Sequence, residues 1–187
     1  MRIYPMLVPG YLTNSYLVSD DDRNAVIIDP GKVSKEMVFL IEQNHLRLQA
    51  VLLTSYAPEH SEGVGALGKI YRFSVHSFKD GLRGGEEITF GSLSFSVLHL
   101  PGCRLDTVGY LLDNQVLFSG DSLLSGTLAP AESYMQRALL IKSVREKIMP
   151  LADDIFLYPG RGPLSRTGLE KMYNLDLIMT EASFPSI

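Results

Sequence analysis

The sequence predicts an α+β protein in which two mixed β-sheets pack face to face with helices outside, a four-layer αβ/βα sandwich. Two observations carry this prediction. Short apolar runs with strand character alternate along the chain with segments whose apolar residues recur at helical spacing. These segments also group into β-rich halves that helices close, without an internal linker or a low-complexity stretch. We therefore expect residues 1–187 to form one domain.

Strands are expected where a short apolar run is bounded by turn residues. The runs at 15–19 and 25–31 flank the polar segment DDDRN and form a predicted hairpin. A buried strand is expected at 48–55, and the pair Asp113-Asn114 is typical of a tight hairpin turn. The other predicted strand segments are 73–78, 86–100, 108–120 and 154–160.

Helices are expected at 33–46, 62–71, 134–149 and 167–173. Ser34 is placed to accept a hydrogen bond from the first turn of the first of these helices. In the segment 134–149, the apolar residues recur at helical spacing and predict one buried stripe: Met135, Ala138, Leu139, Ile141, Val144 and Ile148.

The segment GVGALG (63–68) has the glycine spacing of a dinucleotide-binding motif. In that motif the glycines follow a strand directly, because the turn itself holds the pyrophosphate. Here eight residues separate Thr54 from Gly63. We interpret the glycines as positions where a helix packs closely on a sheet.

Composition excludes several classes of partner. Lys and Arg total 17 against 21 Asp and Glu, a net charge of −4, and no basic cluster matches a phosphate backbone. No run of about 18 apolar residues occurs, and prolines interrupt the N-terminal segment before a signal-peptide core forms. We expect a cytoplasmic protein that binds neither nucleic acid nor membranes. Because Cys103 is the single cysteine, no intrachain disulfide can form.

Four loops that follow predicted strands carry the residues that could bind a metal or take part in catalysis. They read TSYAPEH (54–60), HLPGC (99–103), FSGDS (118–122) and YPGRGP (158–163). Together with AVIIDPG around Asp29, their order resembles the metallo-β-lactamase fold, most closely its small glyoxalase-II-like hydrolases. The resemblance covers nearly the whole chain. It implies the predicted sandwich and loops that meet to hold two metal ions.

Most of the ligand positions that the resemblance implies carry other residues in this sequence. The family's first loop reads T-H-x-H-x-D-H, and its further ligands are a His after Pro-Gly, an Asp after Ser-Gly and a His in P-G-H-G-P. Only His60 and Asp121 are retained. The corresponding pocket positions of this chain are Ser55, Ala57, Glu59, His60, Cys103, Asp121 and Arg161.

The position of the first metal ion lacks suitable donors. Ser55, Ala57 and Cys103 offer an alcohol, a methyl group and one thiol, whereas zinc needs three or four nitrogen, sulfur or carboxylate ligands. We therefore expect no dinuclear centre.

The position of the second metal ion keeps better donors but gains a cation. Glu59, His60 and Asp121 are suitable ligand types, and Cys103 is a further candidate. Arg161 has no lone pair to give. The most direct expectation is no cofactor at all, and the alternative is one zinc or iron ion on these four donors.

Arg161 suggests how two carboxylates could be neutralised without a metal. We expect its guanidinium within salt-bridge distance of Glu59 or Asp121. Simpler interpretations remain open, since carboxylates also cap turns and His60 could lie on the surface at a helix start. Cys103 could act as a nucleophile if a neighbouring cation lowered its pKa.

Three functional hypotheses follow from the sequence. The first is a metal-free pseudo-enzyme whose pocket binds a small molecule or a protein, or has a regulatory role. The alternative is a mononuclear metal-dependent hydrolase of a small ester or thioester, in which the metal activates water. The third is a metal-free enzyme that uses Cys103 or the carboxylates. The identity of the ligand and the oligomeric state stay open.

Overall fold

The first of two mixed sheets is built from the N-terminal part of the chain. The computed structural model describes residues 1–183, with side chains through residue 179. Five strands lie in the order β1-β2-β3-β4-β5. Antiparallel pairing joins β1 (Arg2–Val8), β2 (Thr13–Ser19) and β3 (Asn24–Ile28), and parallel pairing joins β3, β4 (Arg47–Leu52) and β5 (Ser74–His76).

The second sheet has six strands in the order β11-β10-β9-β8-β7-β6. The antiparallel strands β6 (Glu87–Phe90), β7 (Leu93–His99), β8 (Val108–Leu112) and β9 (Val116–Gly120) are followed by β10 (Phe156–Pro159), which pairs parallel to β9, and by β11 (Ser165–Arg166). Asp113 and Asn114 both have positive φ, 48° and 53°, as the predicted hairpin turn requires.

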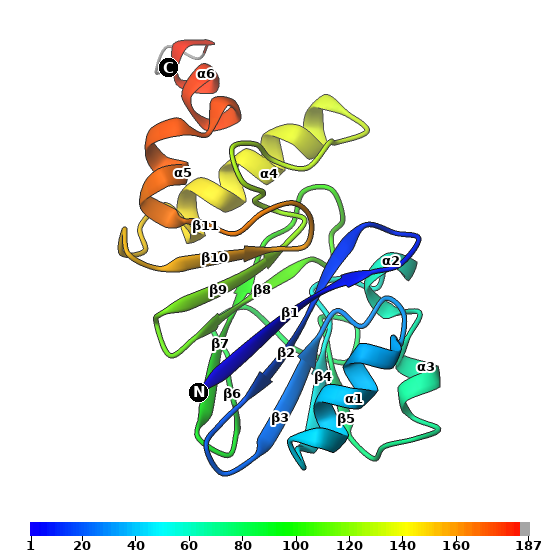
Figure 1. Cartoon of the computed structure of the whole chain (residues 1–187). Coiled ribbons are helices and arrows are strands. Elements are labelled where there is room, and N and C mark those ends of the chain that lie inside the picture. The colour runs from blue at the N-terminus through cyan, green and yellow to red at the C-terminus, as the bar shows by residue number, and fades with distance from the viewer. Residues whose placement is uncertain (184–187) are drawn as a thin grey trace.

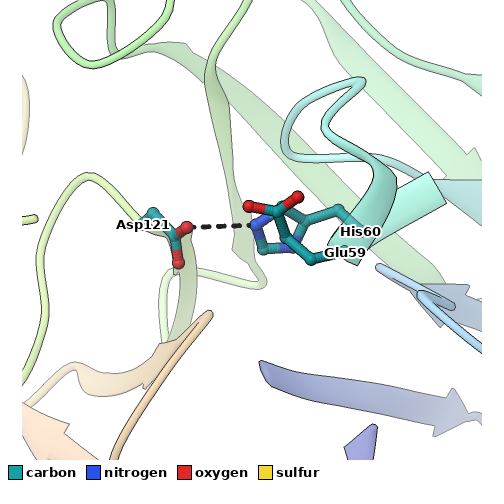
Figure 2. A group of neighbouring side chains, drawn as sticks. All are labelled: Glu59, His60 and Asp121. Atoms are coloured by element: carbon teal, nitrogen blue, oxygen red, sulfur yellow. Dashed lines mark hydrogen bonds and ion pairs between the residues drawn. The ribbon is translucent and has the colours of Figure 1, made fainter. Parts of the chain in front are cut away.

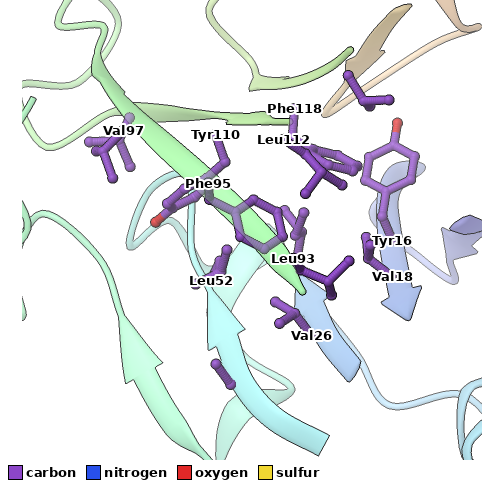
Figure 3. Packing of buried hydrophobic residues seen from close by; sticks show 14 of the residues in the cluster. Tyr16, Val18, Val26, Leu52, Leu93, Phe95, Val97, Tyr110, Leu112 and Phe118 are labelled. Carbon is purple, nitrogen blue, oxygen red and sulfur yellow. The ribbon is translucent and has the colours of Figure 1, made fainter. Parts of the chain in front are cut away.

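The two sheets pack face to face and helices cover their outer faces (Figure 1). Aromatic and branched residues of both sheets fill the space between them, among them Tyr16, Phe95, Tyr110 and Phe118 (Figure 3). Helix α1 (Lys35–Gln43) packs on the first sheet, and α4 (Tyr134–Lys147) packs on the second. Because both faces of each sheet are covered, the central strands β3, β8 and β9 are buried along nearly their whole length rather than alternating. The predicted four-layer sandwich is confirmed.

The helices follow local sequence signals only in part. Ser34 caps α1, its hydroxyl accepting from the Met37 amide at 3.0 Å, and α5 (Thr167–Tyr173) has the predicted bounds. The predicted helix 62–71 is shorter than expected, since α3 covers only Val64–Leu67, and a separate short helix, α2 (Pro58–Ser61), precedes it. Of the stripe predicted for 134–149, Val144 and Ile148 are buried, whereas Met135, which is 81% exposed, and Ala138 face solvent.

Strands β1 and β11 and helix α6 (Leu175–Ser183) were not predicted. Strand β1 contains Pro5, which a central strand would not tolerate, but β1 is the edge of its sheet and can lack a backbone donor. Helix α6 follows α5 almost directly. Among residues 1–183, no helix combines the length and apolarity needed to cross a membrane.

Candidate functional site

The candidate site lies where strands of both sheets end. Asp29 directly follows β3, Asp121 follows β9, and Arg161 comes shortly after β10. Glu59 and His60 lie on α2, after the loop that leaves β4. Figure 2 shows the Glu59 and His60 side chains projecting from α2 toward Asp121 on the opposite loop. The fold thus brings together residues that the sequence separates widely.

Helix α2 is placed by local signals and by one close approach. Pro58 is its first residue, a position where the missing amide hydrogen costs nothing, and the His60 amide donates to the Ala57 carbonyl at 2.9 Å. A Cβ atom at Gly31 would lie 1.9 Å from the Glu59 carbonyl oxygen. Only glycine therefore lets the loop after β3 pass close enough to bring Asp29 to His60.

His60 is buried between two carboxylates. Its side chain is 1% exposed, with Nδ1 3.1 Å from Asp29 Oδ2 and Nε2 3.2 Å from Asp121 Oδ2. The Nδ1 contact is close but not aligned as a hydrogen bond, so we treat it as charge attraction. Burial alone would lower the pKa of His60, yet the two carboxylates raise it to about 10. In the metal-free protein this residue is an imidazolium, and the interpretation of His60 as a surface residue is wrong.

Arg161 bridges the two carboxylates at the mouth of the site. Its Nη2 lies 3.0 Å from Glu59 Oε1 and its Nε lies 3.3 Å from Asp121 Oδ2. A third, longer contact joins Nη1 to the Tyr11 carbonyl at 3.4 Å. Burial would raise the pKa of Asp121, but hydrogen bonds and charge from His60 and Arg161 lower it. The expected ion pair with at least one carboxylate is confirmed, and both are engaged.

Glu59, His60 and Asp121 also form a candidate metal group. Each offers one ligand atom, and these atoms lie within 4.8 Å of one another. Asp121 Oδ1 is buried without a hydrogen-bond partner. A Cβ atom at Gly160 would come within 2.6 Å of that oxygen, so glycine keeps the space beside it open. Among the described residues no further His, Cys, Asp or Glu joins the group, so the Cys103 thiol lies outside it.

Ser55, Ala57 and Cys103 line a pocket of about 430 Å³ beside the metal group. The Ser55 hydroxyl accepts from the Ala57 amide at 3.4 Å, and the Cys103 thiol donates to the Pro130 carbonyl at 3.2 Å. Burial raises the pKa of Cys103, which disfavours the thiolate. These residues do not fit a first metal ion, because they bring no imidazole or carboxylate to its position.

The sequence prediction missed two residues that shape the site. Asn14 on β2 donates from Nδ2 to the carbonyls of Pro159, at 3.0 Å, and Gly162, at 2.9 Å. Tyr11 supplies the carbonyl next to Arg161. Both lie about 150 positions before the loop that they hold. No local pattern signals a contact at that separation.

Comparisons with known proteins agree with the resemblance seen in the sequence. No family model matches the chain. The hydroxyacylglutathione hydrolase GloC of Haemophilus influenzae is 29% identical, over 93% of this chain and 97% of the relative. The hydroxyacylglutathione hydrolase of Hydrogenovibrio crunogenus is 28% identical over 83% of this chain, which spans only 60% of that longer relative.

Two solved structures superpose closely. A BLEG-1 B3 metallo-β-lactamase has a TM-score of 0.88 with 26% identity, over 94% of this chain and 99% of the other. ETHE1 from Myxococcus xanthus has a TM-score of 0.85 with 25% identity, over 99% and 92% of the two chains. This chain is a member of the metallo-β-lactamase superfamily. Within that superfamily it is related to the hydroxyacylglutathione hydrolases, the glyoxalase II type, as its loops indicated.

Proposed function

We propose that the chain is a hydrolase of small esters or thioesters that works with one metal ion held by Glu59, His60 and Asp121. The observation that carries this proposal is the convergence of these three donors beside an open pocket, with Asp121 Oδ1 buried and unpartnered. The similarity to hydroxyacylglutathione hydrolases over almost the full chain supports the reaction class.

Glu59, His60 and Asp121 are suitable ligand types for one metal ion, but metal binding has to displace existing interactions. Catalytic zinc sites have three protein ligands and one open position, and Glu59, His60 and Asp121 supply that number of nitrogen and carboxylate donors. The imidazolium of His60 must first lose a proton, and Arg161 must give up its contacts with Glu59 and Asp121. We therefore expect weak metal binding that strengthens as pH rises.

The chain's own residues prepare the site in several ways. A divalent ion in such a site polarises a carbonyl group and lowers the pKa of a water molecule. Asp29 fixes the His60 ring through Nδ1, which leaves Nε2 facing Asp121 and the pocket side. The pocket wall offers apolar surface from Ala57, Leu124 and Pro130 for an acyl group.

A metal-free binding protein is the second candidate, and one observation favours it. Arg161 already pairs with both carboxylates, so each has a counter-ion without a metal. In that case the pocket binds its ligand without turnover. Catalysis by Cys103 has less support, because its thiol pKa is raised.

Elemental analysis and a hydrolysis assay test the proposal together. Protein purified without chelator should carry up to one equivalent of metal and hydrolyse S-lactoylglutathione, with turnover lost on chelation and restored by added Zn²⁺, Mn²⁺ or Fe²⁺. Asp121→Asn should abolish that turnover. Asp154→Asn, an exposed carboxylate before β10, serves as the matched control and should retain it. Metal-loaded protein without turnover, which still binds a thioester in thermal-shift assays, would favour the second candidate.

A further inference from the structure

We propose that Arg161 competes directly with a metal ion for the Glu59 and Asp121 carboxylates, and thereby sets how tightly the pocket holds a cation. The inference deepens the proposed function, because it concerns the same three donors, but it does not depend on catalysis.

Arg161 contacts one oxygen of each carboxylate in the candidate metal group. Its Nη2 donates to Glu59 Oε1 at 3.0 Å, and its Nε donates to Asp121 Oδ2 at 3.3 Å. The same Asp121 oxygen also receives His60 Nε2 at 3.2 Å. The unpartnered oxygen of the group is Asp121 Oδ1. A metal ion that binds Glu59 Oε1 or Asp121 Oδ2 must therefore displace the guanidinium, and its charge opposes a cation at the neighbouring oxygens as well.

The backbone around Arg161 is fixed, so this contact is built into the fold. The Asn14 amide donates to the Gly160 carbonyl at 2.7 Å, and the Asn14 side chain donates to the Gly162 carbonyl at 2.9 Å. The Gly160 amide in turn donates to the Gly120 carbonyl at 2.7 Å, next to Asp121. These hydrogen bonds hold the backbone of Arg161 close to Glu59 and Asp121. Less conformational entropy is therefore lost when the ion pairs form.

The charge of Arg161 opposes metal binding, as its direct contacts with the carboxylates do. Asp29, Glu59 and Asp121 face the two cations His60 and Arg161, three negative charges against two positive ones. Removal of Arg161 would leave two net negative charges beside the pocket. An incoming dication would then meet attraction where the guanidinium now repels it.

Arg104 is the matched control for a general charge effect. It lines the same pocket, but its Nε pairs with Asp106 Oδ1 at 2.9 Å rather than with the candidate ligands. A change in metal affinity that depends on net charge would follow either arginine. A change that depends on direct competition would follow Arg161 alone.

The test is a calorimetric titration of Mn²⁺ and Zn²⁺ into chelator-treated protein, with the rise in melting temperature on metal addition as a second readout. Arg161→Ala should bind metal at least about tenfold more tightly than the natural chain. Arg161→Gln, which removes the charge and keeps much of the volume, should follow it. Arg161→Lys should fall in between, because an ammonium cannot bridge both carboxylates as a guanidinium does. Arg104→Ala should leave the affinity unchanged.

Three outcomes overturn the inference: equal affinity in the natural chain, Arg161→Ala and Arg161→Gln; an equal gain in Arg104→Ala; or no metal binding by any variant. Metal binding by the Arg161 variants but not by the natural chain would uphold the inference and refute the proposed metal-dependent hydrolase. If Arg161→Ala fails to fold, Arg161→Gln and Arg161→Lys decide the matter in the same assay.

Discussion

Asp29 and His60 form a buried ion pair, with Oδ2 of Asp29 3.1 Å from Nδ1 of His60. The two side chains are only 3% and 1% exposed. The same carboxylate accepts from the Thr54 amide at 2.7 Å and from the Thr54 hydroxyl at 2.6 Å. One side chain therefore ties the end of β3 to the loop after β4 and orients the imidazole toward the pocket.

Replacement of Asp29 by Asn should destabilise the fold by about 3–5 kcal/mol, because it leaves the His60 charge poorly compensated in a buried site. Urea unfolding at pH 7 measures this loss. Asp22→Asn, an exposed carboxylate in the turn before β3, is the control and should change the free energy of unfolding by less than about 0.5 kcal/mol. A loss below about 1 kcal/mol for Asp29→Asn would show that the pair is not a structural tie.

Titration of His60 should make the metal-free protein less stable at alkaline pH. Its pKa is raised from 6.5 to about 10 in the fold. The stability that this gives is fully present below pH 6.5 and is lost as pH rises through about 10. The urea midpoint of chelated protein should therefore fall over that interval.

The His60→Gln variant isolates this effect from other groups that titrate near the same pH. It should be less stable than the natural chain at pH 6 and should lose less stability on going to pH 10. An NMR titration of the imidazole provides a direct check. An ordinary pKa near 6.5 for His60 would contradict the buried ion pairs.

Removal of Arg161 should cost little stability. Its side chain is 38% exposed and its partners are partly exposed, so each ion pair contributes about 0–1 kcal/mol. Arg161→Ala should lower the free energy of unfolding by about 1 kcal/mol at pH 7. Because the pKa of Asp121 is lowered from 3.8, its share of this stability is present above pH 3.8 and disappears as pH falls below it.

Denaturant unfolding of Arg161→Ala at pH 7 and pH 3 tests both statements. A loss of about 3–5 kcal/mol at neutral pH would instead describe a buried pair. If Arg161→Ala lost the same free energy of unfolding at both pH values, the stability that Arg161 gives would not depend on the charge of Asp121.

Asp20 joins the two sheets and should matter most in acid. Its carboxylate accepts from the Asn24 amide at 2.7 Å and from the Ser92 amide at 3.0 Å, across the two hairpin turns. Burial would raise the pKa of Asp20, but these hydrogen bonds lower it to about 2. The stability that they give is present above pH 3.8 and is lost as pH falls through about 2.

Asp20→Asn should cost about 2 kcal/mol at pH 7, because hydrogen bonds to a charged acceptor are replaced by weaker ones. The difference from the natural chain should vanish near pH 2, in acid unfolding followed by circular dichroism. Asp21→Asn is the control, since its side chain is 89% exposed. An acid transition unchanged by Asp20→Asn would contradict the tie.

Local signals in the sequence were sufficient where short-range chemistry decides the backbone. Ser34 caps α1, Asp113-Asn114 forms the hairpin turn, and α5 keeps its predicted bounds. Each rests on residues within a few positions of one another. The prediction failed where pairing at long range overrides local preference, as in β1, where Pro5 is acceptable only because the strand lies at an edge.

The sequence by itself determined which residue types stand in the site. His60 and Asp121 match the family's metal ligands, and Arg161 is a residue that cannot bind a metal. From this we predict that no dinuclear centre forms, and the predicted contact between Arg161 and a carboxylate is confirmed. Tertiary structure decided the rest. Asn14 fixes the loop that carries Arg161, and Asp29 holds His60 as a buried imidazolium. Protonation and affinity depend on distance and burial, and those arise only when segments far apart in the chain pack together.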